Sequence, residues 1–476
     1  MRLIASLFLL FALVKVNAQE EKLDLKVNDK PSYYQYDTDF LPASFHKARR
    51  DSLRALLPDS SAAVFFAAPE RKRSNDVYYE YHQDPNFYYF SGYREPNAVV
   101  VIFKEDQVIN GEKTNEIIYV QERDPGMELW EGRRLGGENA KKQLGFEAVA
   151  INTSFDTADL AMNNLKTVYF QEPEAMEDED TSKTDNLSGL YAHLSQKVDK
   201  SHQGSARMLP VLTAQLRQSK TAEELVLLRK AIDITCEAQI ELMKNIEPEM
   251  AEYETEAIIE YVFKKNGAEY PGFPSIQGSG ENSCILHYTS NRRPLKNGGL
   301  LVSDVGAEYH AYTADVTRTI PPSGKFSKEE KQIYNLVLEA QNAGIEASVA
   351  GNTFWEPHRA ALKVITDGLM KLKIIENASE VGNYFMHGTS HYLGLDVHDA
   401  GLYMAFAPNQ VITVEPGIYI AEGSNCDPKW WNIGVRIEDD ILITAGEPEN
   451  LSAMAPRTIG EIEKLMQSSQ LEKGLK

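Results

Sequence analysis

The sequence is poor in cysteine, which excludes two kinds of site. Its 476 residues contain three cysteines, Cys236, Cys284 and Cys426. An odd, widely spaced set does not form a disulfide framework. No CxxC pair occurs among them, so a zinc site built from thiolates is excluded as well.

Several catalytic motifs are also missing. The chain has no phosphate-binding GxxxxGK loop, no GxGxxG after a predicted strand, and no GxSxG elbow. A hydrolase that uses a serine or thiol nucleophile therefore has no support. Low-complexity repeats are absent too.

Positive charge is scarce. There are 49 Lys and Arg residues against 70 Asp and Glu, which gives a net charge of −21. Such acidity favours solubility and argues against nucleic-acid binding. It is compatible with steering of a cationic peptide amino terminus toward the protein.

One apolar run stands out, at the start of the chain. Residues Met1–Ala18 combine Arg2, an apolar core at Leu3–Val14, and a small-residue cleavage site at Val16–Ala18. The core is too short to span a bilayer and is followed by Lys15. No cysteine follows the site, so no lipid anchor is expected. We predict a signal peptide over 1–18 and a secreted or periplasmic protein without a membrane anchor, whose net charge becomes −23 once the two positive charges of the segment are removed.

The first domain is predicted over residues 41–215, after an extended lead-in over 19–40. An acid-rich stretch at 172–180 lacks the spacing of an EF-hand loop and is interpreted as a solvated loop. Alternating strands and helices favour an α/β domain. The predicted helices are Leu41–Leu57, Gly137–Leu144 and Thr157–Asn164, and the predicted strands are Ala62–Ala67, Phe87–Phe90, Ala98–Phe103 and Ile117–Val120.

A second domain is predicted over residues 216–476. Thr221 and Glu224 have the spacing of a capping box that opens a long helix. Further helices are predicted at Tyr253–Lys265 and Lys328–Val349. The stretch 271–291 is rich in Gly, Pro and Ser and is not expected to form a regular element, and His287 within it is expected to precede a strand.

Residues Leu300–Ile320 form the first of two predicted hairpins. Two apolar runs flank a tight centre, and each carries one aspartate, Asp304 and Asp315. If the chain folds back near Tyr309–His310, the two aspartates face each other directly. Like charges so placed destabilise a bare sheet, so we expect a positive group between them.

The second predicted hairpin repeats this arrangement. Val411–Ile420 and Gly434–Ile443 have the pattern of strands joined by a polar loop. Folding back at Cys426–Asp427 in that loop places Glu415 opposite Glu438. The two hairpins indicate that the second domain is an internal pseudo-duplication.

These carboxylates, with a histidine, predict a metal centre. Three histidines, His387, His391 and His398, lie between the two hairpins in sequence. Four carboxylates and one imidazole carry a charge of about −4, which two divalent cations neutralise. Any one of these residues alone would be an ordinary strand Asp or a satisfied His. Hard oxygen ligands with one imidazole favour Mn²⁺, with cobalt or zinc as alternatives.

At these residues the chain resembles a known family, the pita-bread metallopeptidases, and specifically aminopeptidase P. Matching N-terminal segments separate it from the methionine aminopeptidases, which lack such a domain. The resemblance implies an α/β (α+β) fold, with an N-terminal α/β domain before a pita-bread catalytic domain. The matching segments are SDVGAEYHAYTADVTRTIP, HGTSHYLGLDVHD, TVEPGIYI and GVRIEDD, then FAAPERKRSNDVYYEYHQDPNFYYFSGYREPNAVVVI and ELWEGRRLG.

The resemblance implies a role for each metal ligand. Asp315 and Glu438 bridge two ions, Asp304 completes one ion, and His391 and Glu415 complete the other. A bridging water, its pKa lowered from 15.7 toward about 7, supplies a hydroxide that attacks the scissile carbonyl. The implied activity is a dimetal exopeptidase that releases the residue ahead of proline, a Xaa-Pro aminopeptidase.

Other site residues are implied by the resemblance or by spacing. By resemblance, His287 lies beside the metals, His387 and His398 contact substrate, and Glu415 also shuttles a proton. His398 could instead be structural, at the end of a strand. Arg436, two residues before Glu438, is expected on the same strand face, holding a carboxylate, with a surface ion pair as the alternative.

Trp130 matches a family tryptophan that helps close the site of a neighbouring subunit. A homo-oligomer, dimer or tetramer, is implied by this resemblance alone. An ordinary buried tryptophan within one subunit is the alternative. The chain also departs from the family pattern in its PGFPS stretch and at Glu249, where family members carry Gly.

Three rival functions stay open. A prolidase shares the fold and ligands but cleaves only Xaa-Pro dipeptides. A non-catalytic pita-bread protein used for binding, and a creatinase-like amidinohydrolase without metals, are opposed by the complete ligand set.

Overall fold

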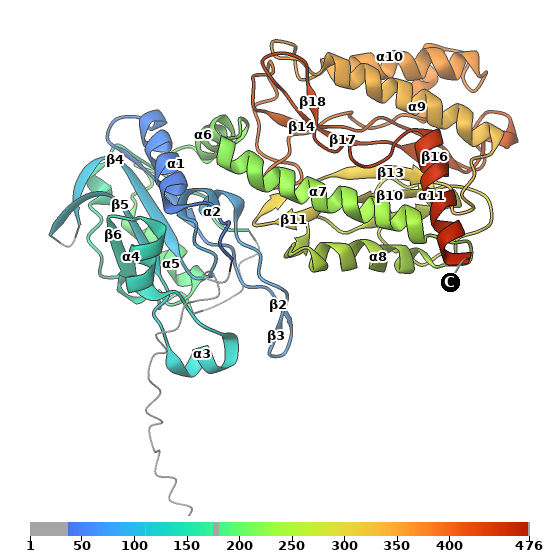
Figure 1. Cartoon of the computed structure of the whole chain (residues 1–476). Helices are drawn as coiled ribbons and strands as arrows, with labels where there is room; N and C mark the ends of the chain where they lie inside the picture. The colour runs from blue at the N-terminus through green and yellow to red at the C-terminus, as the bar shows by residue number, and fades with distance from the viewer. Residues whose placement is uncertain (1–36, 110, 175–179, 475–476) are drawn as a thin grey trace, which may run out of the picture.

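The computed structural model describes residues 37–109, 111–174 and 180–474. The predicted signal peptide and most of the predicted lead-in lie outside these residues, as does the centre of the acid-rich stretch 172–180. Two domains lie side by side, with α6 and α7 at their junction (Figure 1). Within the described part of the chain, no helix is long and apolar enough to cross a membrane.

The N-terminal domain is built on a mixed five-stranded sheet in the order β6-β5-β4-β1-β7. The Val-Val-Val-Ile-Phe run that opens β4 is fully buried, because helices cover the sheet. The strands are β1 Ser61–Phe66, β4 Val99–Ile109, β5 Glu112–Val120, β6 Ala148–Ile151 and β7 Thr167–Tyr169, with a small separate hairpin of β2 Lys72–Ser74 and β3 Val77–Tyr78. The helices are α1 Ala43–Leu56, α2 Pro85–Ser91, α3 Pro125–Glu131, α4 Gly136–Leu144, α5 Leu187–Lys197 and α6 Met208–Arg217.

Two predicted elements of this domain are wrong. The apolar run Phe87–Phe90 was predicted as a strand but forms α2, because the Asp84 carboxylate accepts a 2.7 Å hydrogen bond from the Phe87 N–H and caps the helix. A short apolar run does not by itself distinguish strand from helix. The helix predicted at Thr157–Asn164 is only a 3₁₀ turn at Met162–Asn164, preceded by Ala161 with φ 48°.

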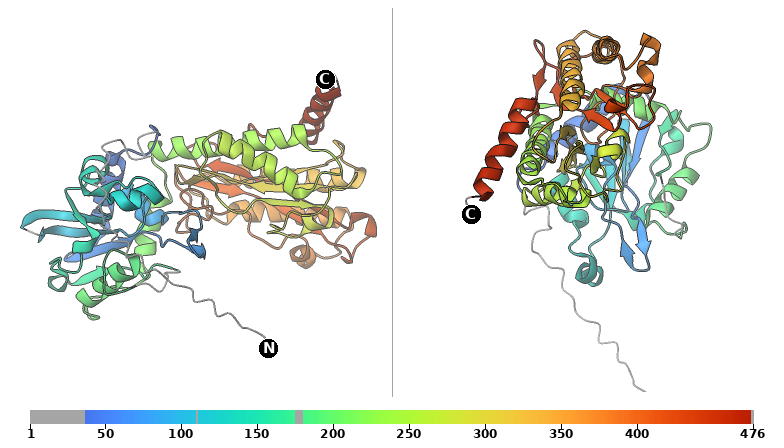
Figure 2. Two further views of the ribbon diagram at one scale, coloured as in Figure 1. Left: turned by 90° about the horizontal axis from the view of Figure 1, so that it is seen from below. Right: turned by 90° about the vertical axis from the view of Figure 1, so that its right-hand side faces the viewer.

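The second domain places its strands between two pairs of helices (Figures 1 and 2). The predicted capping box is confirmed: the Thr221 N–H donates to the Glu224 carboxylate over 2.8 Å where α7 begins. A matching box at Ser327 opens α9. The pairs are α7 Ala222–Asn245 with α8 Glu252–Lys265, and α9 Lys328–Ala347 with α10 Glu356–Lys371, while α11 Ile459–Gly474 packs on α7.

The first predicted hairpin is present, but its predicted register is wrong. His310 and Ala311 have φ 49° and 72° and form the turn, one residue later than predicted. Asp304 therefore pairs with Thr317 rather than with Asp315. A shift of two residues keeps every side chain on its face, so the two aspartates remain diagonal neighbours. The strands are β10 Leu301–Val305, β11 Ala307–Tyr309, β12 Tyr312–Thr313 and β13 Val316–Ile320.

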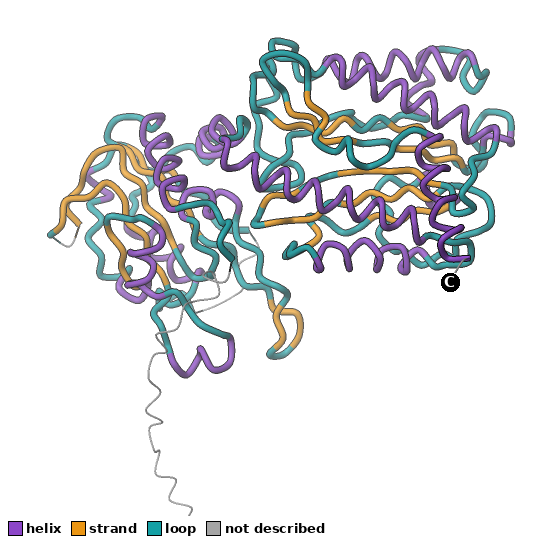
Figure 3. The backbone as a smooth tube through the Cα atoms, viewed as in Figure 1, coloured by secondary structure: helices purple, strands orange, loops and turns teal. Residues whose placement is uncertain are grey.

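The second hairpin has the predicted register. Val414 pairs with Asp439 and Gly417 with Arg436, so the ladders on both sides bring Glu415 opposite Glu438. Each hairpin is interrupted close to its carboxylates, with β10 ending at Val305 and β14 at Val414. Figure 3 shows the strands of this domain as short segments separated by loop. The strands are β14 Val411–Val414, β15 Gly417–Ile420, β16 Ile433–Arg436 and β17 Asp439–Leu442, with β18 Glu449–Asn450 beside β17.

The Gly- and Pro-rich stretch 271–291 is more regular than predicted. It completes β8 (Tyr270–Pro271) and contains β9 (Ile276–Ser279), which pairs with β10. His287 lies in a turn, and in the described chain the next strand begins only at β10, so the expected strand after it is wrong. Glu249 has φ 74°, a left-handed conformation that accounts for glycine at this family position.

Candidate metal centre

The carboxylates lie in the breaks of the two hairpins or beside them. Asp304 belongs to β10 and Asp315 immediately precedes β13, while Glu415 follows β14 and Glu438 precedes β17. A strand break leaves a side chain free to turn out of the regular alternation. His391 is fixed beside them, because the Thr413 N–H on β14 donates to its carbonyl over 3.0 Å.

The five predicted metal ligands are brought together. Ligand atoms of Asp315, His391 and Glu438 all lie within 4.8 Å of one another. His391 Nε2 is 3.5 Å from Asp315 Oδ2 and 3.6 Å from Glu415 Oε1. Its Nδ1 lies 3.0 Å from the Tyr392 carbonyl, to which it must donate, so Nε2 presents a lone pair to the carboxylates.

The electrostatics of the cluster fit a cation. Burial, then the charge of Asp304, raises the pKa of Asp315 well above its ordinary value. Burial, then Asp315 and Glu415, does the same for Glu438. Among the residues that the structure describes, no hydrogen-bond partner reaches the buried oxygens Asp304 Oδ1 and Asp315 Oδ1. Buried carboxylates that repel one another and lack donors are satisfied by a divalent ion, so these residues fit the metal that their chemistry predicts.

Arg436 is the positive group nearest to the aspartates. It is buried, and its guanidinium donates to Asp304 Oδ2 over 2.5 Å and to the Tyr419 hydroxyl over 2.9 Å. The alternative of a surface ion pair is therefore wrong. Because Arg436 contacts Asp304 and not Asp315, it orients one carboxylate and does not replace the cation between the two.

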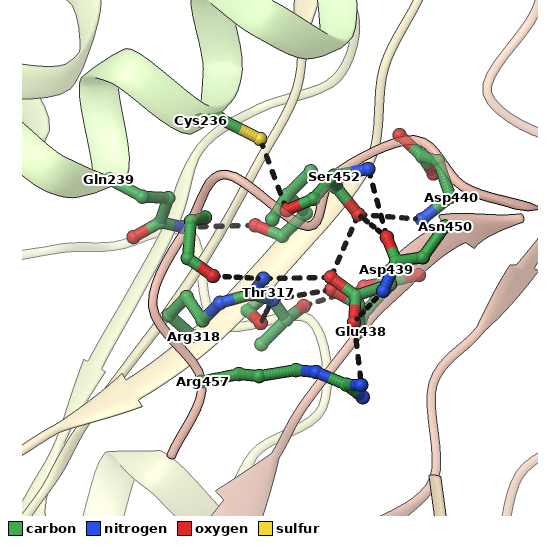
Figure 4. A network of polar contacts seen from close by, with 12 residues as sticks. Cys236, Gln239, Thr317, Arg318, Glu438, Asp439, Asp440, Asn450, Ser452 and Arg457 are labelled. Carbon is green, nitrogen blue, oxygen red and sulfur yellow. Dashed lines mark hydrogen bonds and ion pairs between the residues drawn. The ribbon is translucent and has the colours of Figure 1, made fainter. Parts of the chain in front are cut away.

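Glu438 belongs to a buried network of polar contacts (Figure 4). Thr317 on β13 donates its hydroxyl proton to Glu438 Oε2 over 2.6 Å. The neighbouring Arg318 donates to the Glu438 carbonyl over 2.7 Å and pairs with Asp439 Oδ1 at 2.7 Å. Arg318 and Asp439 are fully buried. This network joins the two hairpins and fixes both the main chain and the carboxylate of Glu438.

The metal-ligand cluster faces a cavity of about 610 Å³. The predicted histidines His287, His387 and His398 all line it, with the five ligands and Arg436. Phe273, Pro274, Ile276, Leu286 and Val397 form its apolar wall.

His387 is held in one protonation state. Burial and the charge of Arg436 lower its pKa to about 4, so the ring is neutral near pH 7. Nδ1 lies 2.7 Å from the Gly388 carbonyl and must donate, and Nε2 then accepts from the Tyr419 hydroxyl at 2.9 Å. Both nitrogens are occupied, so contact with a substrate requires that the ring exchange one partner.

His398 lines the cavity next to His391. Its ring meets the ring of His391 edge-on with the centroids 4.4 Å apart. A neighbouring cavity of about 700 Å³, lined mostly by the N-terminal domain, also has His398 in its wall. This histidine therefore stands where the two cavities adjoin.

Trp130 is not among the residues that line either cavity. It lies on α3 of the N-terminal domain with 87% of its surface exposed, so the alternative of a buried tryptophan is wrong. Figure 1 shows α3 projecting from the domain, away from the strands that carry the carboxylates.

Sequence reasoning missed three residues that shape the site. Thr317 and Tyr419 orient Glu438 and His387, and Asp440 accepts a hydrogen bond from the Asp315 N–H over 3.2 Å. Spacing offered a signal for Tyr419, because it lies four residues after Glu415 in an extended segment and so shares its face. Thr317 and Asp440 lie two residues after Asp315 and Glu438 and so had the same signal, but the sequence did not show that their partners lie on the other hairpin.

Fold and site together define a metallopeptidase. The profile of metallopeptidase family M24 matches residues 226–445, and that of the aminopeptidase P N-terminal domain matches residues 46–169. The chain belongs to the aminopeptidase P family, which confirms the resemblance seen in the sequence.

Relatives and solved structures agree with this family. The chain is 36% identical to the Xaa-Pro aminopeptidase of Escherichia coli over 446 residues, which cover 88% of this chain and 96% of the relative. Against that of Haemophilus influenzae the identity is 37% over 439 residues, with 90% and 98% covered. Aminopeptidase PepP of Pseudomonas aeruginosa matches with a TM-score of 0.82 and 34% identity over 91% of this chain and 100% of that one. Zinc-substituted E. coli aminopeptidase P with product matches with a TM-score of 0.81 and 34% identity, over 90% and 99%.

Proposed function

We propose that this protein is a Xaa-Pro aminopeptidase, which removes the first residue of peptides whose second residue is proline. The observation that carries the proposal is the complete cluster of four carboxylates and His391 at the wall of a cavity that three further histidines line. The alignments with two relatives named for this activity cover 88% and 90% of the chain. A binding protein or a metal-free amidinohydrolase would not need five metal ligands.

The protein's own residues would hold two divalent ions. Asp304, Asp315, Glu415 and Glu438 from the two hairpins, with His391, would supply the ligands. When bound, two such ions lower the pKa of a water and so supply a nucleophile at neutral pH. The weight of oxygen donors favours Mn²⁺. Metal analysis of purified protein tests both the identity of the metal and its count of two per chain.

Other side chains would handle protons and orientation. Burial raises the pKa of Glu415 against the opposing charges of His391 and Arg436, so this carboxylate is suited to take a proton and return it to the leaving amine. His398, which lines the cavity beside His391, would contact the scissile carbonyl. Removing one such transition-state donor costs about 10²–10³ in turnover.

Proline selectivity would come from the shape of the cavity. A Xaa-Pro bond is a tertiary amide without an N–H, and its ring is rigid. The apolar wall that includes Phe273, Ile276 and Val397 offers a surface for that ring close to the carboxylates.

We also propose that the protein is exported after removal of residues 1–18. The basic start, the short apolar core and the small-residue site support this. Mass spectrometry of protein recovered from the periplasm or medium of an expressing bacterium should find a mature chain that begins at Gln19. Recovery of full-length chain from the cytoplasm alone would contradict export.

Hydrolysis of Arg-Pro-Pro and Arg-Pro by metal-free protein titrated with Mn²⁺ tests the activity. Metal-dependent release of arginine from the tripeptide is the expected result. Cleavage of the dipeptide alone would identify a prolidase. No cleavage of either peptide, with no metal bound, would contradict the proposal.

A further inference from the structure

The segment from His391 to Asp399 is anchored at its two ends in different ways. Its first end is joined to β14, because the Thr413 N–H donates to the His391 carbonyl and the Leu393 N–H donates to the Val411 carbonyl, both over 3.0 Å. Its far end, which carries His398, is not part of any strand. The position of His398 therefore depends on contacts made by its neighbour Asp399.

Asp399 is held by two buried cations. Lys220 Nζ lies 2.6 Å from Oδ2, and the Arg217 guanidinium donates to Oδ1. The side chains of Lys220, Arg217 and Asp399 are 1%, 5% and 1% exposed. The Asp399 N–H also donates to the Tyr392 carbonyl over 2.9 Å, which closes the segment on itself.

Both cations come from the junction between the domains. Arg217 ends α6, and Lys220 precedes α7 by one turn residue. Arg217 also donates to Asn86 of the N-terminal domain over 2.7 Å, and the Lys220 N–H donates to the Asn409 carbonyl over 2.7 Å. The junction thus contacts both domains and the His398 segment at once.

The packing around this cluster leaves no room for adjustment. A Cβ at Gly394 would lie 2.2 Å from Asp399 Oδ2 and 2.8 Å from Lys220 Nζ. The segment can pass the two ionised groups here only because it has a glycine at this point.

We propose that Arg217 and Lys220 are positioning residues for catalysis, which hold His398 at the cavity through Asp399 and so couple the domain junction to the reaction. The proposal rests on the role of His398 in the proposed function. It predicts that Lys220 contributes to turnover only through that histidine.

A double-mutant cycle of Lys220→Met and His398→Ala tests this coupling. With Arg-Pro-Pro as substrate and saturating Mn²⁺, K220M should lower kcat by about tenfold or more, while KM changes less than about threefold, since a transition-state contact is lost. In the native chain, H398A should lower kcat by a factor of about 10²–10³. In the K220M background the same substitution should lower kcat far less, because the contact between His398 and the substrate is already disturbed.

The matched control is Arg50→Met in the N-terminal domain. Glu116 is buried and held by Arg50 and Arg54, as Asp399 is held by Arg217 and Lys220, so R50M also removes one of two cations from a buried carboxylate. R50M should leave kcat near the native value, and its effect should be additive with H398A. If K220M does not fold, Gly394→Ala displaces Asp399 without removing a charge and should give the same non-additivity.

Additive effects of H398A with K220M or G394A would overturn the proposal, as would native kcat in folded K220M. An H398A variant with full activity would overturn it too, because no histidine contact would exist to position. Hydrolysis of Arg-Pro-Pro by the native protein is measured in the same series, so failure of the proposed function itself would be seen separately.

Discussion

Among single residues, the buried carboxylates of the metal centre oppose the stability of the metal-free fold. Asp315 and Glu438 are buried among like charges, and within the described part of the chain no hydrogen-bond donor reaches Asp315 Oδ1. A packed core would exclude such an arrangement unless a cation compensated it. Removal of one carboxylate charge from this site should therefore raise the stability of the metal-free fold and lower the activity.

Glu438→Gln should demonstrate this opposition. The raised pKa of Glu438 means that its ionised form disfavours folding: the stability that the protonated form provides in acid is lost as pH rises through the folded-state pKa. Glutamine keeps an acceptor for Thr317 without the charge. In chelator at pH 7.5, the free energy of unfolding of the variant should exceed that of the native protein by roughly 1 kcal/mol or more. The rate of peptide hydrolysis should fall by a factor of at least about 10³.

Glu116→Gln is the control for this experiment. Despite the opposing effect of burial, Arg50 and Arg54 lower the pKa of the Glu116 carboxyl, so its neutralisation should destabilise the protein. Urea unfolding in chelator and in Mn²⁺ measures both variants. Equal destabilisation of the two metal-free variants would contradict the account of Glu438.

At the scale of elements, the interrupted hairpins decide where the ligands lie. β10 gives way to β11 at Gly306, which lies beside the break that holds Asp315. The Ala314 N–H donates to the Ala307 carbonyl over 3.1 Å there, so the two strands stay joined across the interruption. Where the two strands approach most closely, at Gly306, only a residue without a side chain fits.

Gly306→Ala should damage both fold and site. Its Cβ would lie 1.7 Å from the Ala314 carbonyl oxygen, so the strands must separate. We expect a loss of about 3 kcal/mol or more in unfolding free energy, with weaker Mn²⁺ binding by calorimetry. Gly382→Ala is the control, because a Cβ there meets no atom within 4 Å. A G306A protein with native stability would show that the hairpin can break elsewhere.

The turn between β11 and β12 should make stability depend on pH. His310 Nδ1 and Nε2 lie 2.8 and 2.9 Å from carboxylate oxygens of Glu269 and Asp39. Burial alone would lower the pKa of His310, but these two carboxylates outweigh it and raise the pKa above 6.5. The stabilisation is therefore complete below pH 6.5 and is lost as pH rises through the folded-state pKa.

His310→Asn removes this charge and still tolerates the positive φ of the turn. The variant should be less stable than native protein by about 1–2 kcal/mol at pH 5.5, and the difference should shrink toward pH 9 in urea unfolding. His358→Asn should show the reverse trend, because burial lowers the pKa of that histidine. A constant difference for H310N across this range would exclude an ion pair at the turn.

At the scale of the whole molecule, the exposed face of α3 bears on assembly. Met127, Leu129 and Trp130 are 38%, 67% and 87% exposed, so α3 presents an apolar surface that the residues described by the structure do not cover. Three neighbouring exposed apolar side chains are a common feature of an interface. This supports the proposed homo-oligomer, in which Trp130 reaches the site of a neighbouring subunit.

Trp130→Ala should lower the fraction of oligomer in sedimentation velocity and reduce kcat/KM for Arg-Pro-Pro. Truncating a central interface tryptophan typically costs about 2 kcal/mol or more of association free energy. Trp355→Ala is the matched control, since Trp355 is 51% exposed on the catalytic domain. A native protein that sediments as a monomer would contradict the proposed assembly.

The sequence alone determined the class of the protein and most of its chemistry. Residue types at the site, the capping box that opens α7, and the register of the second hairpin follow from local pattern, because capping and strand alternation act between residues close in the chain. Local pattern predicted a strand at Phe87–Phe90, where the cap formed by Asp84 favours a helix. It also placed the turn of the first hairpin one residue too early. Tertiary structure alone decided which groups meet across elements: Asp304 with Arg436, Thr317 with Glu438, and the domain junction with Asp399. The members of these pairs lie 132, 121 and 179 positions apart in the chain, well beyond the reach of any local periodicity. Burial and hydrogen bonding between separate elements depend on how the helices and hairpins pack together.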